Sequence, residues 1–205
     1  MKTLIVFNHP YSGSYCNAIL DSVIAGLKRT NHEIDLLYLD KEDFDPVMRA
    51  KDLEAFSKAK REKTSMLQSL DPIVLEYKKR LENAERLIFI FPIWWELMPA
   101  LTKGFIDKVI FPGIAYDYLG ETKMRGRLPN LKGLTVITTM NTPSFFYRFV
   151  FGNAVKKALL LGTFWKIGVR NRKWISLNMV KFVSENKRKN WLTRIENRFA
   201  AQYPG

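Results

Sequence analysis

The sequence predicts a doubly wound α/β sandwich, in which helices cover both faces of a parallel, five-stranded sheet. Short apolar runs alternate with helical patterns along the chain, which is the order of elements in such folds. Most positions in these runs are apolar, as expected for strands that are buried on both faces. A length of 205 residues suits one hydrophobic core, so we expect a single domain over residues 1–205.

The chain begins with a strand, a helix and a strand. The runs TLIVF (3–7) and EIDLLYL (33–39) are short and apolar, so they are predicted strands. A helix is predicted from about Ser14 to Thr30, because apolar residues recur there at a four-residue spacing. These residues are Ile19, Val23 and Leu27. A strand-helix-strand unit of this length places its two strands parallel.

Three further strands are predicted in the rest of the chain: RLIFIF (86–91), GLTVITT (133–139) and WISLNMV (174–180). Residues 48–83 look helical and mostly polar, with Pro72 as an interruption. One helix should follow the third strand and another should close the chain, each with an apolar face. The residues of these faces are Leu101, Phe105 and Val109 in the first helix and Trp191, Ile195 and Phe199 in the second.

Charge is unevenly distributed along the chain. The net charge is +13, and residues 148–205 contribute +11 of it, with 13 Lys or Arg against Glu185 and Glu196. A basic C-terminal third could meet an anionic cofactor, an acidic lipid surface or nucleic acid, or it could be a solvated face. The cations are not interleaved with a regular array of stacking aromatics, so no nucleic-acid partner is expected. A weak contact with an anionic surface stays open.

Signals of compartment and metal binding are few. The apolar run near the N-terminus is far shorter than the core of a secretory signal, and no stretch has the roughly 18 apolar residues of a membrane span. Cys16 is the single cysteine, which fits a reducing compartment. The histidines, His9 and His32, lie in no ligand-spaced cluster, so no metal site is expected. We expect a cytoplasmic protein without an integral membrane segment.

The loop after the first predicted strand is a candidate phosphate site. In doubly wound sheets, ligands bind beyond the carboxyl ends of the strands, where the strand order reverses. NHPYSGSYCN places Ser12, Gly13 and Ser14 at the start of a helix, where free N–H groups and the helix dipole favour an anion. Ser14 as a simple helix cap is the alternative. The chain has no GxGxxG and no GxxxxGK followed by Ser or Thr, which argues against a Rossmann turn and a phosphate-transfer loop.

The loops after the third and fourth strands supply aromatic residues at the same sheet edge. PIWWELMP (92–99) holds Trp94 and Trp95 between prolines, and two adjacent side chains of a loop cannot both enter one core. A flat heteroaromatic ligand needs such an apolar platform, with fixed hydrogen bonds along its rim. MNTPSFFY (140–147) could turn its amides toward that rim. A phosphate site and a ring site on neighbouring strand ends together indicate a flavin pocket.

These motifs resemble those of the flavodoxin-like NAD(P)H:quinone oxidoreductases, of the DT-diaphorase and modulator-of-drug-activity type. The matching segments are HPYSGSYCNAI, FDPVM, FPIWWELMPALTKGFIDKVI, GIAYDY and the threonines at 138 and 139, in order and spacing over residues 3–147. The resemblance implies a flavodoxin-like three-layer sandwich and a homodimer with the flavin site at its interface. It implies noncovalent FAD, with FMN as the alternative. It also implies hydride transfer from NAD(P)H through the flavin to quinones or similar acceptors by a ping-pong mechanism.

The resemblance assigns roles to individual residues. It places one set around the flavin phosphates: His9, Ser14, Tyr15, Cys16 and Asn17. A second set would run along the flavin ring, with Trp95 stacked on it and also in contact with substrate: Pro92, Ile93, Trp94, Trp95 and Glu96. A third set would meet the pyrimidine side of the ring: Thr138, Thr139, Met140 and Asn141. Tyr147 would be the catalytic residue at the flavin rim, while Tyr116, Tyr118 and Asn153 would contact substrate, the two tyrosines from across the dimer interface.

This chain departs from the family pattern at three places. Cys16 stands where the family commonly has Asn. Met140 and Asn141 replace the usual pair of glycines, which leaves the loop less free. Asn153 replaces a histidine, so a Tyr-His proton relay is not expected.

Other functions stay open beside the oxidoreductase. Some relatives regulate potassium-efflux systems from the cytosolic side of the membrane, and an accessory flavoprotein of that kind is the main alternative. A binder of nucleic acid or membrane surfaces and a one-electron flavodoxin carrier are further alternatives. The roof formed by Tyr116 and Tyr118 favours a small-molecule acceptor over the carrier. FAD or FMN, and NADH or NADPH, both remain open.

Overall fold

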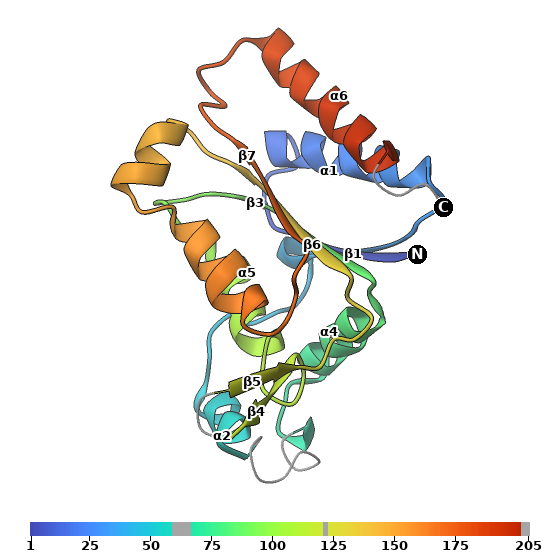
Figure 1. Cartoon of the computed structure of the whole chain (residues 1–205), viewed down its shortest axis with the longest axis vertical. Helices are drawn as coiled ribbons and strands as arrows, with labels where there is room; N and C mark the ends of the chain where they lie inside the picture. The colour runs from blue at the N-terminus through green and yellow to red at the C-terminus, as the bar shows by residue number, and fades with distance from the viewer. Residues whose placement is uncertain (59–66, 121–122, 202–205) are drawn as a thin grey trace.

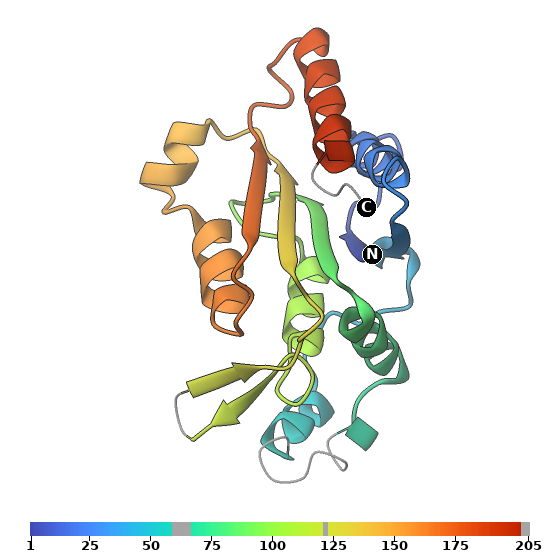
Figure 2. The ribbon, with the colours of Figure 1, turned by 45° about the vertical axis from the view of Figure 1, so that its right-hand side comes forward.

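A five-stranded parallel sheet forms the centre of the molecule, as predicted. The computed structural model describes residues 1–58, 67–120 and 123–201. The strand order is β2-β1-β3-β6-β7, and every neighbouring pair is parallel. Figure 2 shows β3, β6 and β7 side by side. The strands are β1 (Lys2–Phe7), β2 (Glu33–Tyr38), β3 (Arg86–Pro92), β6 (Gly133–Thr139) and β7 (Arg172–Leu177). The order reverses between β1 and β3, which makes their carboxyl ends the switch point of the sheet.

Helices cover both faces of this sheet and complete a three-layer sandwich (Figure 1). Helices α1 (Tyr15–Lys28) and α6 (Glu185–Ala201) lie on one face, and α4 (Pro72–Asn83) and α5 (Ala100–Val109) lie on the other. Most residues of the predicted apolar faces are buried against the sheet, and Leu101 and Trp191 are half-buried. The first face buries Ile19, Val23, Leu27, Ile195 and Phe199 in one cluster.

The fifth strand lies closer to the N-terminus than predicted. The sequence predicts a strand over 174–180, whereas β7 begins at Arg172 and ends at Leu177. Asn178 leaves the sheet because its side chain accepts a hydrogen bond from the Ser176 hydroxyl and donates one to the Thr142 carbonyl. Met179 then adopts a left-handed backbone with φ 60°, which turns the chain toward α6.

The predicted helical stretch over 48–83 contains two helices. Helix α2 spans Ala50–Lys58, and α4 begins at Pro72. Pro72 therefore starts a helix, because proline has no N–H group to lose at the first helical position. Residues 59–66 of the predicted stretch lie outside the described residues.

The FDPVM segment packs directly on α5. A Cβ atom on Gly104 would lie 2.3 Å from the Pro46 Cβ and 2.5 Å from its carbonyl oxygen. Only glycine allows this close approach of backbone to helix. The contact fixes the middle of α5 relative to the connection after β2.

Two features were not predicted. Strands β4 (Tyr116–Leu119) and β5 (Lys123–Gly126) form an antiparallel hairpin at the end of the molecule opposite the start of α6 (Figures 1 and 2). The segments η2 (Phe146–Val150) and η3 (Lys156–Trp165) are π-helical, a conformation that occurs often at functional sites. In the described ranges no helix is both long and apolar enough to span a membrane.

Candidate ligand site at the carboxyl edge of the sheet

Asn8 ties together the elements that surround the switch point. Its backbone N–H donates to the Ile90 carbonyl at 3.0 Å, which joins the ends of β1 and β3. Its side chain donates to Asp40 Oδ2 at 2.9 Å and accepts from the Thr102 hydroxyl at 2.8 Å. Asn8 is only 2% exposed. Sequence reasoning missed this residue, although a polar residue directly after a buried strand is a usable signal.

The start of α1 offers a cluster of free amides. Ser14 caps the helix, since its Oγ accepts from the Asn17 N–H at 3.3 Å and from Asn17 Nδ2 at 3.0 Å. Within the described residues, four backbone N–H groups of this loop have no acceptor. They belong to Ser12, Gly13, Tyr15 and Cys16. Such groups at a helix N-terminus favour an anion, so capping and anion binding are compatible here.

His9 brings this loop to the loop after β3. Its ring lies edge-on to the Trp94 ring, with the centroids 6.1 Å apart. Its Nδ1 accepts from the Tyr11 N–H, and its carbonyl accepts from the Tyr38 hydroxyl at 3.0 Å. Burial lowers the pKa of His9, although the Asp40 carboxylate opposes the effect. The imidazole is therefore neutral at pH 7.

The other predicted phosphate-site residues use their side chains to hold the loop. The Cys16 thiol is buried against the Thr139 hydroxyl at 3.3 Å, and burial raises its pKa to about 11. The Tyr15 hydroxyl donates to the Arg188 carbonyl at 2.7 Å, and Asn17 donates to the Tyr11 carbonyl. Contacts from Tyr15 and Cys16 to a phosphate would therefore come from their backbone amides.

The two tryptophans lie on a tight turn with an unusual backbone. Trp94 and Leu97 exchange N–H···O bonds of 3.0 Å, and the residues between them, Trp95 and Glu96, have φ values of 49° and 63°. These values define a type I′ turn, which normally requires Gly or Asn. Trp95 is 98% exposed and Trp94 47%, so the two do not both enter the core, as predicted, and in fact neither does. Strain of this kind persists mainly at functional sites.

Glu96 joins this turn to the loop after β6. One carboxylate oxygen accepts from the Thr142 hydroxyl at 2.6 Å, and the Glu96 carbonyl accepts from the Tyr147 hydroxyl at 3.1 Å. The other carboxylate oxygen is buried and has no partner in the described part of the chain. Below the turn, the Ile93 N–H donates to the Thr139 carbonyl at 2.8 Å. The backbone N–H groups of Trp95 and Glu96 have no acceptor among the described residues.

The residues predicted to meet the pyrimidine side of the ring are largely turned inward. The Thr138 hydroxyl accepts from Trp174 Nε1, and Thr139 pairs with Cys16. Met140 is buried, its N–H donates to Leu177, and its carbonyl accepts from Val180. Asn141 is exposed, and its Oδ1 accepts from the Lys181 N–H. Of the predicted set, Asn141 alone has an exposed position at this edge.

Tyr147 lies beneath the site with its hydroxyl fully engaged. It is 1% exposed, donates to the Glu96 carbonyl and accepts from the Val155 N–H at 3.0 Å. Burial raises its pKa. This geometry fits a residue that positions the two loops rather than one that contacts a ligand directly. Asn153, with φ 57°, follows on the π-helical side and lies away from the turn, where its N–H donates to the Tyr147 carbonyl.

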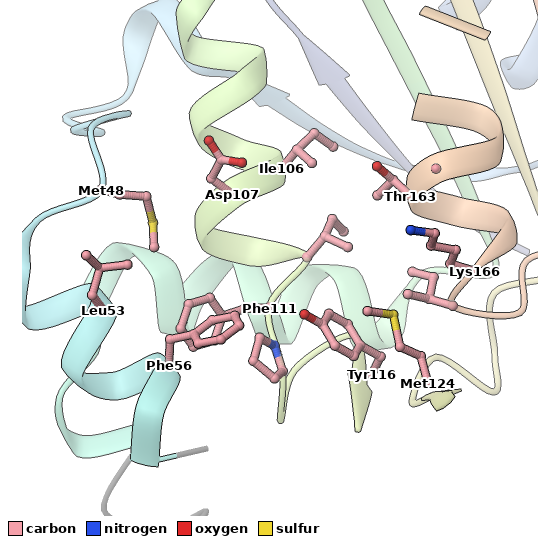
Figure 3. A pocket seen from close by; sticks show the side chains of 14 residues that line it. Met48, Leu53, Phe56, Ile106, Asp107, Phe111, Tyr116, Met124, Thr163 and Lys166 are labelled. Atoms are coloured by element: carbon pink, nitrogen blue, oxygen red, sulfur yellow. The ribbon is translucent and has the colours of Figure 1, made fainter. Parts of the chain in front are cut away.

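Tyr116 and Tyr118 do not reach these loops within one chain. They lie on the β4–β5 hairpin, with their hydroxyl oxygens 3.5 Å apart. Tyr116 lines a cavity of about 520 Å³ between this hairpin, α2, α5 and η3 (Figure 3). The hairpin and the loops lie at opposite ends of the molecule (Figures 1 and 2). A shared site would need a second copy of the chain.

The strand order and the clustered loops define a flavodoxin-like α/β protein with its candidate ligand site at the switch point. A family model described as flavodoxin-like fold matches residues 1–199, and the chain belongs to this family. The family resemblance predicted from the motifs is thereby confirmed.

Individual relatives agree with this assignment. The chain is 29% identical over 153 residues to NAD(P)H dehydrogenase (quinone) 1 of Cavia porcellus, which covers 71% of this chain and 55% of that protein. It is 30% identical over 122 residues to an FMN-dependent NADH:quinone oxidoreductase of Clostridium perfringens, which covers 58% of each. It is 31% identical to the crystal structure of Smu.1420 from Streptococcus mutans, with a TM-score of 0.83 over 98% of this chain and 99% of that one. The chain spans about half the length of the curated relatives it matches.

Proposed function

We propose that this protein is a flavin-dependent NAD(P)H oxidoreductase that reduces quinones or similar small acceptors. The observation that carries the proposal is the convergence of the loops after β1 and β3, which places free amides and the exposed Trp95 at the switch point. Flavodoxin-like sheets bind FMN at this place. The names of the relatives from Cavia porcellus and Clostridium perfringens support a nicotinamide donor and a quinone acceptor.

The protein would bind and orient the flavin with backbone groups. Bound flavin supplies the chemistry, which is to accept a hydride from one substrate and pass it to another. The amides of Ser12, Gly13, Tyr15 and Cys16 would hold the phosphate, and Trp95 would stack on the ring. The N–H groups of Trp95 and Glu96 would donate to polar atoms of the ring edge. Donor and acceptor would use the same open face in turn, which predicts ping-pong kinetics.

The choice of flavin is part of the proposal. The Clostridium perfringens relative is FMN-dependent by name, which supports FMN. A cavity of about 570 Å³ between the loop after β6, the end of β7 and α6 supports the larger FAD. The hydrogen bond from Tyr15 to Arg188 brings the phosphate loop next to the start of α6, where Lys187 and Trp191 line this cavity. We propose FAD, and the mass of the released cofactor decides between the two.

A homodimer belongs to the same proposal. Trp95 and two aromatic residues after β6 are exposed, with Phe145 at 65% and Phe146 at 50%. Exposed apolar patches of this kind mark interfaces. A second copy could cover them and bring its Tyr116 cavity to the flavin face, which would supply the predicted roof. A cytoplasmic location is also proposed, since the single cysteine needs no oxidising compartment.

Steady-state kinetics test this function. Purified protein with flavin should oxidise NADH or NADPH only when a quinone such as menadione is present. Double-reciprocal plots at several quinone concentrations should be parallel. Trp95→Ala should lower the activity at least about tenfold through lost stacking, whereas Trp94→Phe should retain it. Flavin-loaded protein that oxidises neither nucleotide would contradict the proposal.

An accessory role on a membrane potassium-efflux system is the second candidate. The basic segment favours it, because residues 148–205 carry +11 and stand near exposed aromatics. In that case the protein should cosediment with membranes that contain the transporter and remain soluble with membranes that lack it. Equal sedimentation with both would contradict this role.

A further inference from the structure

A second concave site lies beside β7, and its lining shares no residue with the turn that carries Trp95. It is a cavity of about 510 Å³ between η2, η3 and β7. Its lining consists of Arg148, Phe149, Asn153, Lys156, Leu160, Arg172 and Trp174. A volume of this size suits a small organic ligand.

The cavity is cationic and lacks an internal counter-charge. Arg148, Lys156 and Arg172 line it, and no lining residue is acidic. The sequence contains no Asp or Glu between Glu121 and Glu185, so the local chain cannot neutralise this cluster. Across the described residues, none of the three cations forms an ion pair. Like charges gathered in one hollow are unfavourable unless an anion joins them.

Buried polar atoms of the cavity also lack partners. Asn153 Oδ1 and Arg172 Nε have no hydrogen-bond partner in the described part of the chain. Arg172 is otherwise held in place, since it donates to the carbonyl of Arg170 at 2.9 Å and to that of Val169. Asn153 has a left-handed backbone with φ 57° directly after Gly152, and both residue types adopt this conformation readily. One donor and one acceptor beside the cationic cluster are therefore unpaired among the described residues.

The aromatic walls complete the set of groups. Trp174 is oriented by its Nε1–H···Oγ1 bond to Thr138 at 3.0 Å and packs against Tyr147 with ring centroids 5.8 Å apart. Phe149 stands exposed at the rim. Nucleotide recognition uses cations for the phosphate, an aromatic surface for the base, and an amide acceptor for a hydroxyl or amino group.

We propose that this cavity binds a phosphorylated nucleoside through Arg148, Lys156 and Arg172. Two sources share this chemistry: a free nucleotide, or the adenosine 2′-phosphate part of NADPH. The free-nucleotide form of this proposal does not depend on the flavin proposal, whereas the NADPH form rests on the proposed NAD(P)H-dependent function.

Calorimetric titration of the purified protein with adenosine 2′,5′-bisphosphate tests the site. We expect saturable binding that is tighter than binding of inorganic phosphate. Lys156→Glu should weaken it by about tenfold or more, because one charge-assisted contact is lost and a carboxylate is introduced. Lys157→Glu is the matched control, since it makes the same charge change on the adjacent residue outside the cavity lining, and it should weaken binding less than about threefold. Thermal unfolding of both variants checks that they are folded.

Competition distinguishes the two sources. If NADPH is the ligand, NADPH should displace the bisphosphate, NADH should not, and Lys156→Glu should raise KM for NADPH alone. If a free nucleotide is the ligand, 5′-AMP should displace the bisphosphate and neither coenzyme should. No binding by the unaltered protein at millimolar bisphosphate, equal weakening by both variants, or equal affinity for inorganic phosphate would each overturn the proposal. The titration measures binding without turnover, so its result can be interpreted whether or not the protein reduces quinones.

Discussion

Trp95 combines the largest apolar side chain with a backbone conformation that disfavours it. A left-handed residue other than glycine costs about 1–2 kcal/mol, and the side chain recovers none of this through burial because it is 98% exposed. The turn therefore lowers the stability of the isolated chain in order to present an aromatic surface. A ligand that binds to this aromatic surface would explain why two adjacent tryptophans lie on a turn.

Replacement of Trp95 by asparagine should separate stability from ligand binding. Asparagine suits the first central position of a type I′ turn, so Trp95→Asn should raise the free energy of unfolding by about 1 kcal/mol. The same change should weaken flavin binding roughly tenfold, because ring stacking is lost. Denaturant unfolding and fluorescence titration measure the two effects. Trp95→Phe should retain most of the affinity, and a loss of stability in Trp95→Asn would show that the side chain packs against the protein.

His9 should report on a bound phosphate. Burial holds its pKa below the ordinary value of 6.5, so its stabilising effect is present above that pH and is lost as the pH falls. A phosphate bound at the start of α1 would favour the protonated ring and raise this pKa. NMR titration with and without flavin nucleotide measures the shift. His32, whose Nδ1 lies 2.9 Å from the Thr3 hydroxyl at the opposite end of β1, is the internal control and should not respond.

At the scale of elements, the loops after β3 and β6 are linked through Glu96. Its carboxylate accepts a hydrogen bond from the Thr142 hydroxyl, and its carbonyl accepts one from the Tyr147 hydroxyl. One residue therefore fixes the spacing of two loops. The second bond explains why Tyr147 is buried below the site. Its hydroxyl proton is used to hold the turn in place.

Glu96→Ala should loosen this link. Loss of the bond to Thr142 leaves that hydroxyl without its acceptor, and we expect the free energy of unfolding to fall by about 1–3 kcal/mol. Flavin affinity should fall with it, because the turn loses its support. Glu96→Gln keeps an acceptor oxygen and should behave like the unaltered protein in both measurements. If Glu96→Gln were as damaging as Glu96→Ala, the negative charge rather than the hydrogen bond would be the important property.

The elements were predictable to the extent that apolar periodicity determines them. Strand β1, helix α1 and strand β3 were placed within a residue or two because their patterns are uninterrupted and deeply buried. The end of β7 was missed because side-chain contacts of Asn178, distant in sequence from their partner Thr142, end the strand. The π-helical segments were missed because their apolar residues include many that are exposed.

The candidate site was predictable in position but not in orientation. The loops follow from strand order, so His9, Ser14 and Trp95 were placed at the correct edge. Which groups face outward depends on tertiary hydrogen bonds, as for Cys16 and Thr138, whose side chains turn inward. Left-handed φ values at Trp95 and Glu96 have no signal in residue type, since neither residue favours that conformation.

At the scale of the whole molecule, a buried ion pair joins the connection after β2 to α5. Lys108 is 2% exposed and its Nζ lies 3.2 Å from Asp52 Oδ2, where Asp52 is 1% exposed. Buried pairs of this kind add little net stability but are strongly destabilising when one partner is removed. The pair therefore fixes how α2 packs against the main sandwich.

Lys108→Met should destabilise the fold by about 3–5 kcal/mol, because Asp52 is left charged and buried. Adding Asp52→Asn to the same chain should restore much of the lost stability, because the asparagine oxygen can still accept a hydrogen bond from the Arg49 N–H. In the unaltered protein this N–H lies 2.7 Å from Asp52 Oδ2. Urea unfolding of the single and double variants measures the coupling. If the two substitutions had strictly additive effects on the free energy of unfolding, Lys108 and Asp52 would not be energetically coupled.

The central claim is that the carboxyl ends of β1, β3 and β6 together hold one flavin. The most direct measurement is the visible spectrum of the purified protein after incubation with FAD and FMN and removal of the free nucleotide. The account predicts the visible absorbance of a bound flavin, which is a property of the cofactor, at about one flavin per chain. Protein that is folded but stays colourless with both nucleotides would contradict it.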